Sequence, residues 1–203
     1  MEHTLRNKKG VSMPELIAYV ALYGVVMSLL ASLVYVIVVS ARKVNTRAIL
    51  NRGATMLYTE ILSETIRLNP DSVSNVEMSS DNNTISVTFE KKYYYTDEGE
   101  RKSVSDEGSG YANKTTKIKY SYTKGSDNVN VLFVKGDGTS TTSSINLNFK
   151  MTITSHDSEN INNVFSVDTQ NSSNKYVTFH GDLHFDNRKQ EFNFIVPVFT
   201  AKD

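Results

Sequence analysis

The sequence predicts an α+β fold, in which one long N-terminal helix packs on an antiparallel β-sheet domain. An apolar run fills residues 17–41 without a charged side chain, and helical periodicity continues in amphipathic form to residue 69. From residue 73 onward, apolar residues instead recur at every second position, which is typical of strands with one buried face. The predicted β-rich domain spans residues 70–203.

Length and composition exclude several classes of protein. The 203 residues allow one anchor and one domain of modest size. The net formal charge is zero, so no overall electrostatic field favours nucleic acid or another charged partner. Because the chain has no cysteine, a disulfide framework, a zinc–thiolate site and a cysteine nucleophile are all excluded.

Residues 11–41 are predicted to form a transmembrane or filament-core helix. As a helix rising ~1.5 Å per residue, the apolar run is about 37 Å long, which exceeds the ~30 Å hydrocarbon core of a bilayer. The run is too long for an ordinary secretory signal, so we expect it to remain in the mature protein. Glu15 stands just before it. A carboxylate at the membrane centre costs roughly 2.5–3.5 kcal/mol, so Glu15 either needs a partner or lies in the headgroup layer.

The residues around the start of this helix carry a family resemblance. They read Lys8-Lys9-Gly10-Val11-Ser12-Met13-Pro14-Glu15-Leu16. This stretch resembles the class III signal of type IV pilins and pseudopilins, in which a basic leader ends in Gly and a Glu is the fifth residue after the cut. The resemblance implies that residues 1–10 are a cleaved leader, that prepilin peptidase cuts after Gly10, and that Val11 is N-methylated. It also implies that Glu15 serves assembly.

The resemblance implies a structural subunit of a type IV pilus-like filament, either a minor pilin or a pseudopilin, and the size and long polar loops favour a minor pilin over a dominant one. Before assembly the helix would anchor the protein in the cytoplasmic membrane with its N-terminus inside. Afterwards the subunit would lie in an extracellular pilus, or in a periplasmic or cell-wall pseudopilus. The implied partners are prepilin peptidase, other pilin subunits and the membrane. No enzymatic activity, cofactor or nucleic acid is implied. The alternative is a signal-anchored extracytoplasmic binding module that does not polymerise.

Residues 42–69 are predicted to form an amphipathic helix that packs on the globular domain. Its apolar residues recur at steps of three, four or seven and share one face: Leu50, Ala54, Leu57, Ile61 and Leu68. Tyr58 lies on the flank of this face. The opposite side carries Arg52, Ser63 and Arg67, with Met56 among them. Gly53 weakens the helix slightly, and Pro70 ends it because the residue before a proline avoids helical geometry.

The β-rich domain shows six alternating runs separated by turn signals. The runs cover residues 85–89, 118–122, 129–133, 145–153, 176–185 and 192–199, of which 145–153 alternates most clearly. The turn signals are Asp81-Asn82-Asn83, Lys124-Gly125-Ser126-Asp127, Gly136-Asp137-Gly138 and Asp186-Asn187. Pro197 predicts that the last strand is an edge strand or is bulged. Residues 96–114 are predicted to form a long polar loop.

Candidate metal ligands are few in the sequence. His180, Asp182 and His184 alternate along one predicted strand, where the outer two would be ~13 Å apart, too far to share one ion. Gly181 could bend the strand, yet surface histidines remain the better interpretation. Acidic runs at Asp97-Glu98-Gly99-Glu100 and Asp106-Glu107 lack the spacing of an EF-hand. We therefore predict no metal site.

No catalytic constellation emerges either. An anchored hydrolase would need a pocket formed by His156, His180 or His184 with acids, and nothing in their spacing recommends one. The Tyr93-Tyr94-Tyr95 run beside Lys91 and Lys92 could stack on single-stranded nucleic acid. An aromatic strand whose lysines reach into solvent explains the same run more simply. The predicted function therefore rests on the N-terminal helix.

Overall fold

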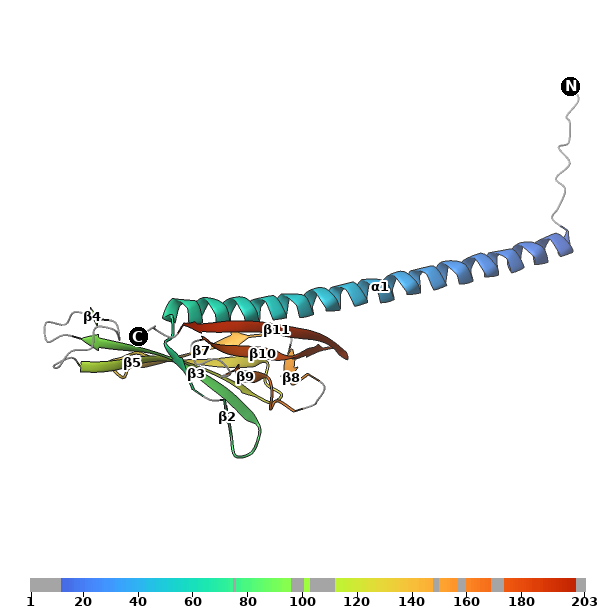
Figure 1. The fold of residues 1–203 in the computed structure, drawn as a ribbon. Helices are drawn as coiled ribbons and strands as arrows, with labels where there is room; N and C mark the ends of the chain where they lie inside the picture. Colours follow the sequence, from blue (N-terminus) through green and yellow to red (C-terminus); the bar gives the residue numbers. More distant parts are fainter. Residues whose placement is uncertain are drawn as a thin grey trace, which may run out of the picture. The chain divides into compact units, whose positions relative to one another are not determined.

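The computed structural model describes residues 12–74, 76–95, 101–102, 112–147, 150–156, 160–168 and 174–199. It divides into two compact units, Met1–Asn45 and Thr46–Asp203. A single long helix, α1 (Met13–Leu68), contributes to both units. The predicted cleavage residues Gly10 and Val11 lie outside the described residues. The architecture is α+β, with one long helix and antiparallel sheets (Figure 1).

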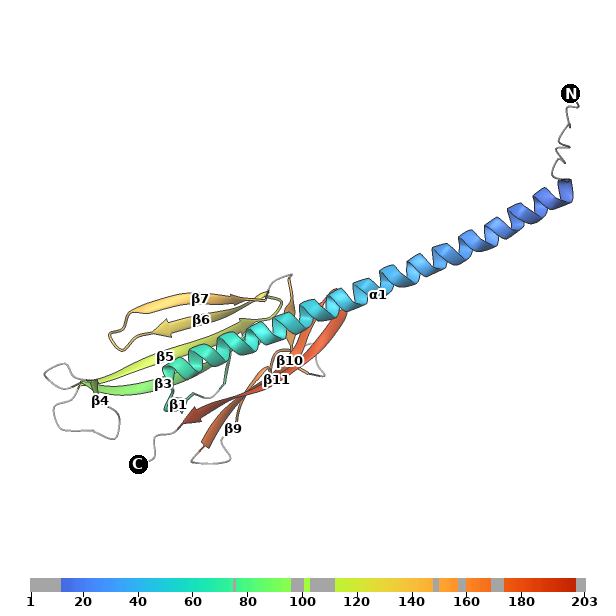
Figure 2. The same cartoon turned by 90° about the horizontal axis from the view of Figure 1, so that it is seen from above.

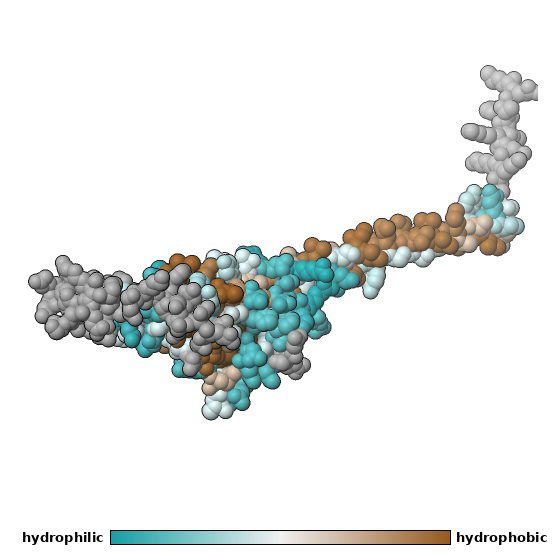
Figure 3. Space-filling model, viewed as in Figure 1, coloured by the Kyte–Doolittle hydropathy of each residue, from teal (hydrophilic) through white to brown (hydrophobic). Residues whose placement is uncertain are grey.

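Between Leu16 and Val38, in the first unit, α1 carries large hydrophobic side chains on every side. Its large hydrophobic side chains between Leu16 and Val38 are all exposed, by 43% or more. Figure 3 shows hydrophobic side chains covering the visible face of this stretch. The helix continues without a break through Gly24 and Ser32, and the Ser32 hydroxyl donates a hydrogen bond of 2.8 Å to the Leu29 carbonyl. A helix that is hydrophobic all round requires an apolar environment or other helices around it.

In the second unit, α1 buries one narrow face. The buried residues recur at steps of three or four: Thr46, Leu50, Gly53, Leu57, Ile61, Thr65 and Leu68. This confirms the predicted face at Leu50, Leu57, Ile61 and Leu68, while Ala54 is half-buried and Arg52, Ser63 and Arg67 are exposed. Thr46, Gly53 and Thr65 were not predicted to be part of the face. The glycine fits because a Cβ there would lie 2.5 Å from Cε of Met151.

The helix ends at Leu68, one residue earlier than predicted. Asn69 adopts a left-handed backbone with φ of 49°, and its N–H donates to the Thr65 carbonyl at 3.0 Å. An asparagine in this conformation is a common helix terminator. Pro70 follows, as the sequence predicted.

The described residues form two antiparallel sheets, so the predicted antiparallel β-sheet domain is confirmed, with its strands divided between the two. The first has seven strands with the order β1-β3-β5-β6-β7, and β2 and β4 also pair with β3. Its strands are β1 (Ser72–Val73), β2 (Glu77–Met78), β3 (Thr84–Tyr95), β4 (Arg101–Lys102), β5 (Ala112–Thr123), β6 (Asn128–Val134) and β7 (Ser140–Asn146). The runs predicted at 85–89, 118–122 and 129–133 are confirmed as parts of β3, β5 and β6.

The second sheet has four strands in the described residues, with the order β11-β10-β8 and β9 also paired with β10. Its strands are β8 (Thr152–Thr154), β9 (Phe165–Asp168), β10 (Asn174–Phe185) and β11 (Arg188–Phe199). The predicted runs 176–185 and 192–199 are confirmed as β10 and β11. In this described part β11 pairs with β10 alone, so Pro197 lies on an edge strand as predicted. Figure 2 shows the part of α1 after Thr46 lying over both sheets, with β7 on one side and β9 on the other.

The run at 145–153, predicted as one strand, is divided between the two sheets. Ile145 lies in β7 of the first sheet, whereas Ile153 lies in β8 of the second. Lys150 adopts a left-handed backbone with φ of 55° between them. Ile145, Leu147 and Met151 are nevertheless buried, as is Ile153. The alternation therefore predicts correctly that these residues are buried, but the prediction that they form one strand is wrong.

The four predicted turns are confirmed, whereas the predicted long loop is wrong in part. Each turn contains a residue with positive φ: Asn82, Gly125, Gly138, and Asp186 with Asn187. Within the predicted loop 96–114, β4 pairs with β3, and β5 already begins at Ala112. Residues 96–100 and 103–111, which include both acidic runs considered for calcium, lie outside the described residues.

Two tyrosines of β5 tie the elements of the second unit together. The Tyr120 hydroxyl donates to the Ile61 carbonyl of α1 at 3.2 Å and lies 3.1 Å from Oγ1 of Thr65. The Tyr122 hydroxyl accepts a 2.7 Å hydrogen bond from the backbone N–H of Ile153, which belongs to the second sheet. Burial raises the pKa of both phenols. Both hydroxyls therefore stay protonated and join helix and sheets from inside the core.

Candidate functional site

The first candidate site is the start of α1. Glu15 lies in the first helical turn and is exposed. A carboxylate at this end of a helix interacts favourably with the helix dipole, which supports a helix beginning here. The predicted cleavage residues Gly10 and Val11 lie outside the described residues, so of the predicted site residues only Glu15, predicted to serve assembly, is described.

The exposed apolar stretch of α1 follows directly. Within the described residues, α1 is the one helix long and apolar enough to cross a membrane by length and composition. None of its most apolar 18-residue window is buried. Each large side chain left in water loses roughly 1.5–3 kcal/mol relative to burial, so this surface strongly favours an apolar partner.

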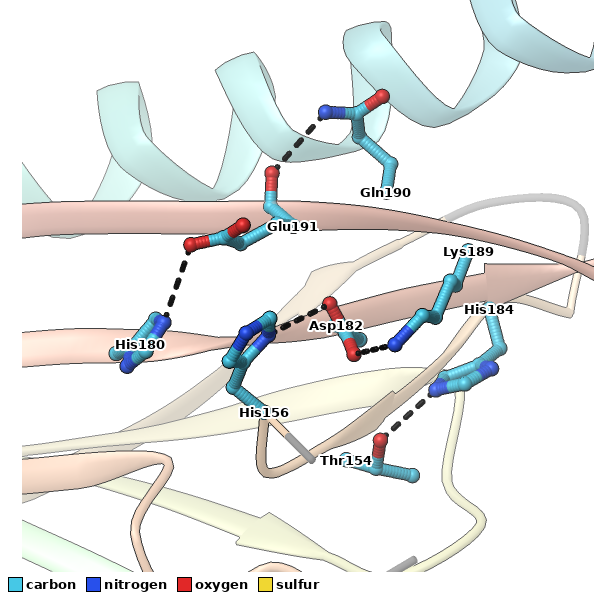
Figure 4. Close-up of polar contacts among 8 residues, drawn as sticks. All are labelled: Thr154, His156, His180, Asp182, His184, Lys189, Gln190 and Glu191. Carbon is cyan, nitrogen blue, oxygen red and sulfur yellow. Dashed lines mark hydrogen bonds and ion pairs between the residues drawn. The ribbon is translucent and has the colours of Figure 1, made fainter. Parts of the chain in front are cut away.

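The second candidate site is a polar cluster on the outward face of the second sheet (Figure 4). Side chains alternate along β10: Val177, Phe179 and Leu183 are fully buried, so His180, Asp182 and His184 point to the other side. The Asp186-Asn187 turn sets the register of the hairpin, in which Asp182 pairs with Glu191 of β11.

Asp182 is the buried centre of this cluster, with its side chain only 4% exposed. Its Oδ2 accepts a hydrogen bond of 2.9 Å from the Lys189 ammonium, and its Oδ1 lies 3.4 Å from Nδ1 of His156. Desolvation raises the carboxyl pKa, but the hydrogen bonds from Lys189 and His156 and the Lys189 charge outweigh it. The net effect lowers the pKa of Asp182, which is therefore ionised near neutral pH.

Two histidines and a glutamate adjoin Asp182. The rings of His156 and His180 have centroids 5.0 Å apart and are tilted by 31°. Nε2 of His180 lies 3.3 Å from Oε1 of Glu191. One ligand atom from each of His156, His180 and Glu191 lies within 4.8 Å of the other two. The arrangement presents two imidazoles and one carboxylate to a common point.

This grouping differs from the one considered from sequence. From the sequence, His184 was a candidate ligand together with His180. In the structure, Nε2 of His184 instead lies 2.8 Å from the Thr154 hydroxyl. His156 was considered only as part of a hydrolase pocket, and Glu191 was missed. The signal that could have found Glu191 was the predicted Asp186-Asn187 turn, because a hairpin closed by this turn places Glu191 opposite Asp182.

Gly181 permits the close packing behind the cluster. Strand β10 does not bend away there, since Gly181 keeps its pairing with Phe192. A Cβ at this position would lie 2.4 Å from the Thr154 carbonyl oxygen. The glycine therefore lets β8 approach β10, which positions the segment carrying His156.

The two lysines that precede the Tyr93-Tyr94-Tyr95 run both contact Asp71, Lys91 through its side chain and Lys92 through its backbone. Lys91 forms an ion pair with Asp71, and the backbone N–H of Lys92 donates to Oδ2 of Asp71 at 3.0 Å. Tyr93 lines an open hollow of about 500 Å³ together with Lys114 and Gly136. These contacts give a structural role to the Lys91 side chain and to the Lys92 backbone, whereas the Lys92 side chain is exposed and the side chains of Tyr94 and Tyr95 lie outside the described part of the chain.

Comparison with known proteins adds no family assignment. No model of a known protein family matches the chain, and no similar curated protein or solved structure was found.

Proposed function

We propose that this chain is a structural subunit of a type IV pilus-like filament, as a minor pilin or pseudopilin. The observation that carries the proposal is the uniformly exposed apolar surface of α1 between Leu16 and Val38, directly after a stretch that resembles a prepilin signal. Before assembly this helix anchors the protein in the cytoplasmic membrane. On assembly it exchanges lipid for the helices of neighbouring subunits, and the second unit faces outward.

Glu15 has a defined role in this proposal. In the apolar filament core its carboxylate pairs with the methylated N-terminal amine of Val11 on a neighbouring subunit. A single buried charge without a partner is severely penalised, and a paired charge much less so. Only the correct register pairs both charges, so Glu15 selects how subunits stack.

Processing at the N-terminus tests the proposal. We expect the protein extracted from membranes of a host with prepilin peptidase to begin at Val11 and to carry one added methyl group there. Intact-mass measurement and N-terminal sequencing check both. A Gly10→Leu variant is the control, because blocking the cut should leave the leader in place. A wild-type chain that still begins at Met1 would support the signal-anchored binding module that does not polymerise.

A further inference from the structure

The cluster of His156, His180 and Glu191 lies outside anything the filament role requires. Its members come from three segments: the turn after β8, strand β10 and strand β11. Their side chains are 32%, 34% and 52% exposed, so the cluster is open to solvent. None of the three supports the hydrophobic core.

The donor set selects a class of ion. Two imidazole nitrogens and one carboxylate suit zinc and its first-row neighbours, whereas calcium and magnesium prefer oxygen ligands alone. Ligand atoms around a tetrahedral zinc ion stand about 3.3 Å apart, given bonds of about 2.0–2.1 Å. His180 Nε2 and Glu191 Oε1 are already separated by 3.3 Å. The His156 ligand atom lies within 4.8 Å of the other two, so closing the set around one ion requires the His156 side chain to move toward them.

Asp182 prepares His156 for coordination. Nδ1 of His156 faces Oδ1 of Asp182 at 3.4 Å, and in the proposed site it is the ring nitrogen that carries the proton and donates to this carboxylate. The lone pair of this imidazole is then on Nε2, the other ring nitrogen. Carboxylates that orient metal-binding histidines in this way are common next to zinc sites. Lys189 holds the Asp182 carboxylate from its other side.

We propose that His156, His180 and Glu191 bind a divalent transition-metal ion of the zinc class, with water in the fourth position. The ion ties the turn after β8 to the β10–β11 hairpin. In a chain without cysteine, where no disulfide can form, it provides a cross-link of the outward domain. The proposal does not depend on the filament role, because its ligands all belong to the second unit.

Cobalt titration of the full chain in detergent micelles tests this proposal. Co²⁺ replaces Zn²⁺ in such sites and absorbs visible light strongly when tetrahedral. We expect a saturable band at one Co²⁺ per chain, displaced by Zn²⁺ but not by Ca²⁺. His156→Ala and His180→Ala should each weaken binding by about 100-fold, and Asp182→Asn by about 10-fold, as for residues that orient a ligand.

His184→Ala is the matched control, because it removes the same side chain from the same face of β10 and should leave the affinity unchanged. A second readout is thermal unfolding, in which Zn²⁺ should raise the midpoint of the wild type and of His184→Ala but not of His180→Ala. Circular dichroism without metal checks that each variant is folded, and Glu191→Gln, the most exposed ligand change, replaces any variant that is not. Absence of a saturable Co²⁺ band, or equal losses in His184→Ala and His180→Ala, would overturn the proposal.

Discussion

Gly181 is the residue on which the contact between β8 and β10 depends. Any other side chain would place a Cβ 2.4 Å from the Thr154 carbonyl oxygen and 3.2 Å from the Phe192 ring. Neither neighbour can move freely, because the first is backbone and the Phe192 side chain is itself buried. The positions of β8 and of the turn carrying His156 therefore depend on the absence of a Cβ at Gly181.

Gly181→Ala should lower the free energy of unfolding by about 1–3 kcal/mol, the usual cost of forcing an extra methyl group into a packed interior. Chemical denaturation of the full chain in detergent, followed by tyrosine fluorescence, measures this. Gly24→Ala is the control, since a Cβ there meets nothing within 4 Å. Equal stability of Gly181→Ala and the wild type would show that β8 can shift without loss.

The tyrosines of β5 show what residue patterns can and cannot predict. The alternation of Ile118, Tyr120 and Tyr122 correctly predicted that all three side chains face the core. It could not predict the hydroxyl partners, because these belong to α1 and to the second sheet. A period of two specifies a face, whereas the partner across that face is set by tertiary packing.

At the scale of elements, the sequence best predicted those features that depend only on residues close together in the chain. The buried face of α1 follows from helical spacing, and the β10–β11 hairpin follows from two runs joined by Asp186-Asn187, whose positive φ values suit a tight turn. Four apolar residues of the helix face, the two strand runs and the turn between them were predicted, because each of these signals lies within one element or between two adjacent ones.

The elements that were missed depend on distant contacts. Residues 145–153 alternate as one strand would, yet a turn at Lys150 sends the chain from the first sheet to the second. Both halves are buried, so the pattern contains no sign of the break. The proposed metal site was missed because it also depends on distant contacts: His156 comes near β10 only because β8 pairs with that strand. Glu191, by contrast, could have been predicted from the register of the β10–β11 hairpin alone.

Two isoleucines on α1 test how much the helix contributes through its buried face. Ile61 is fully buried and Ile66 is 59% exposed. Ile61→Ala should destabilise the second unit by about 2–5 kcal/mol, because it removes buried methyl groups and leaves a cavity. Ile66→Ala, the matched control on the same helix, should change stability by less than about 0.5 kcal/mol. Urea unfolding measures both, and similar losses would contradict the assignment of the helix face.

Across the whole molecule, burial separates the chain into two parts with different requirements. Every buried hydrophobic residue in the described chain lies between Leu50 and Val198, within the second unit. The large apolar side chains from Leu16 to Val38 have no such partners within the described protein. The second unit thus buries a hydrophobic core of its own, whereas the apolar side chains of the first unit stay exposed in the described chain, as suits a helix covered by lipid or by other helices.

Substitutions of Glu15 distinguish between lipid and neighbouring helices as the partner of the apolar surface of the first unit. Lipid anchoring needs only the apolar length of α1, so Glu15→Gln and Glu15→Ala should stay in the membrane fraction. Filament assembly by the proposed pairing needs the carboxylate, because its loss leaves the amine of a neighbour buried without a partner at a cost of about 3–5 kcal/mol. We therefore expect incorporation into sheared filaments, measured by immunoblot against the membrane pool, to fall at least about tenfold.

Glu60→Gln is the control, because it removes an exposed carboxylate from the second-unit part of the same helix and should assemble normally. If both Glu15 variants assemble like Glu60→Gln, the carboxylate has no role in register, and the apolar surface of α1 alone must direct assembly.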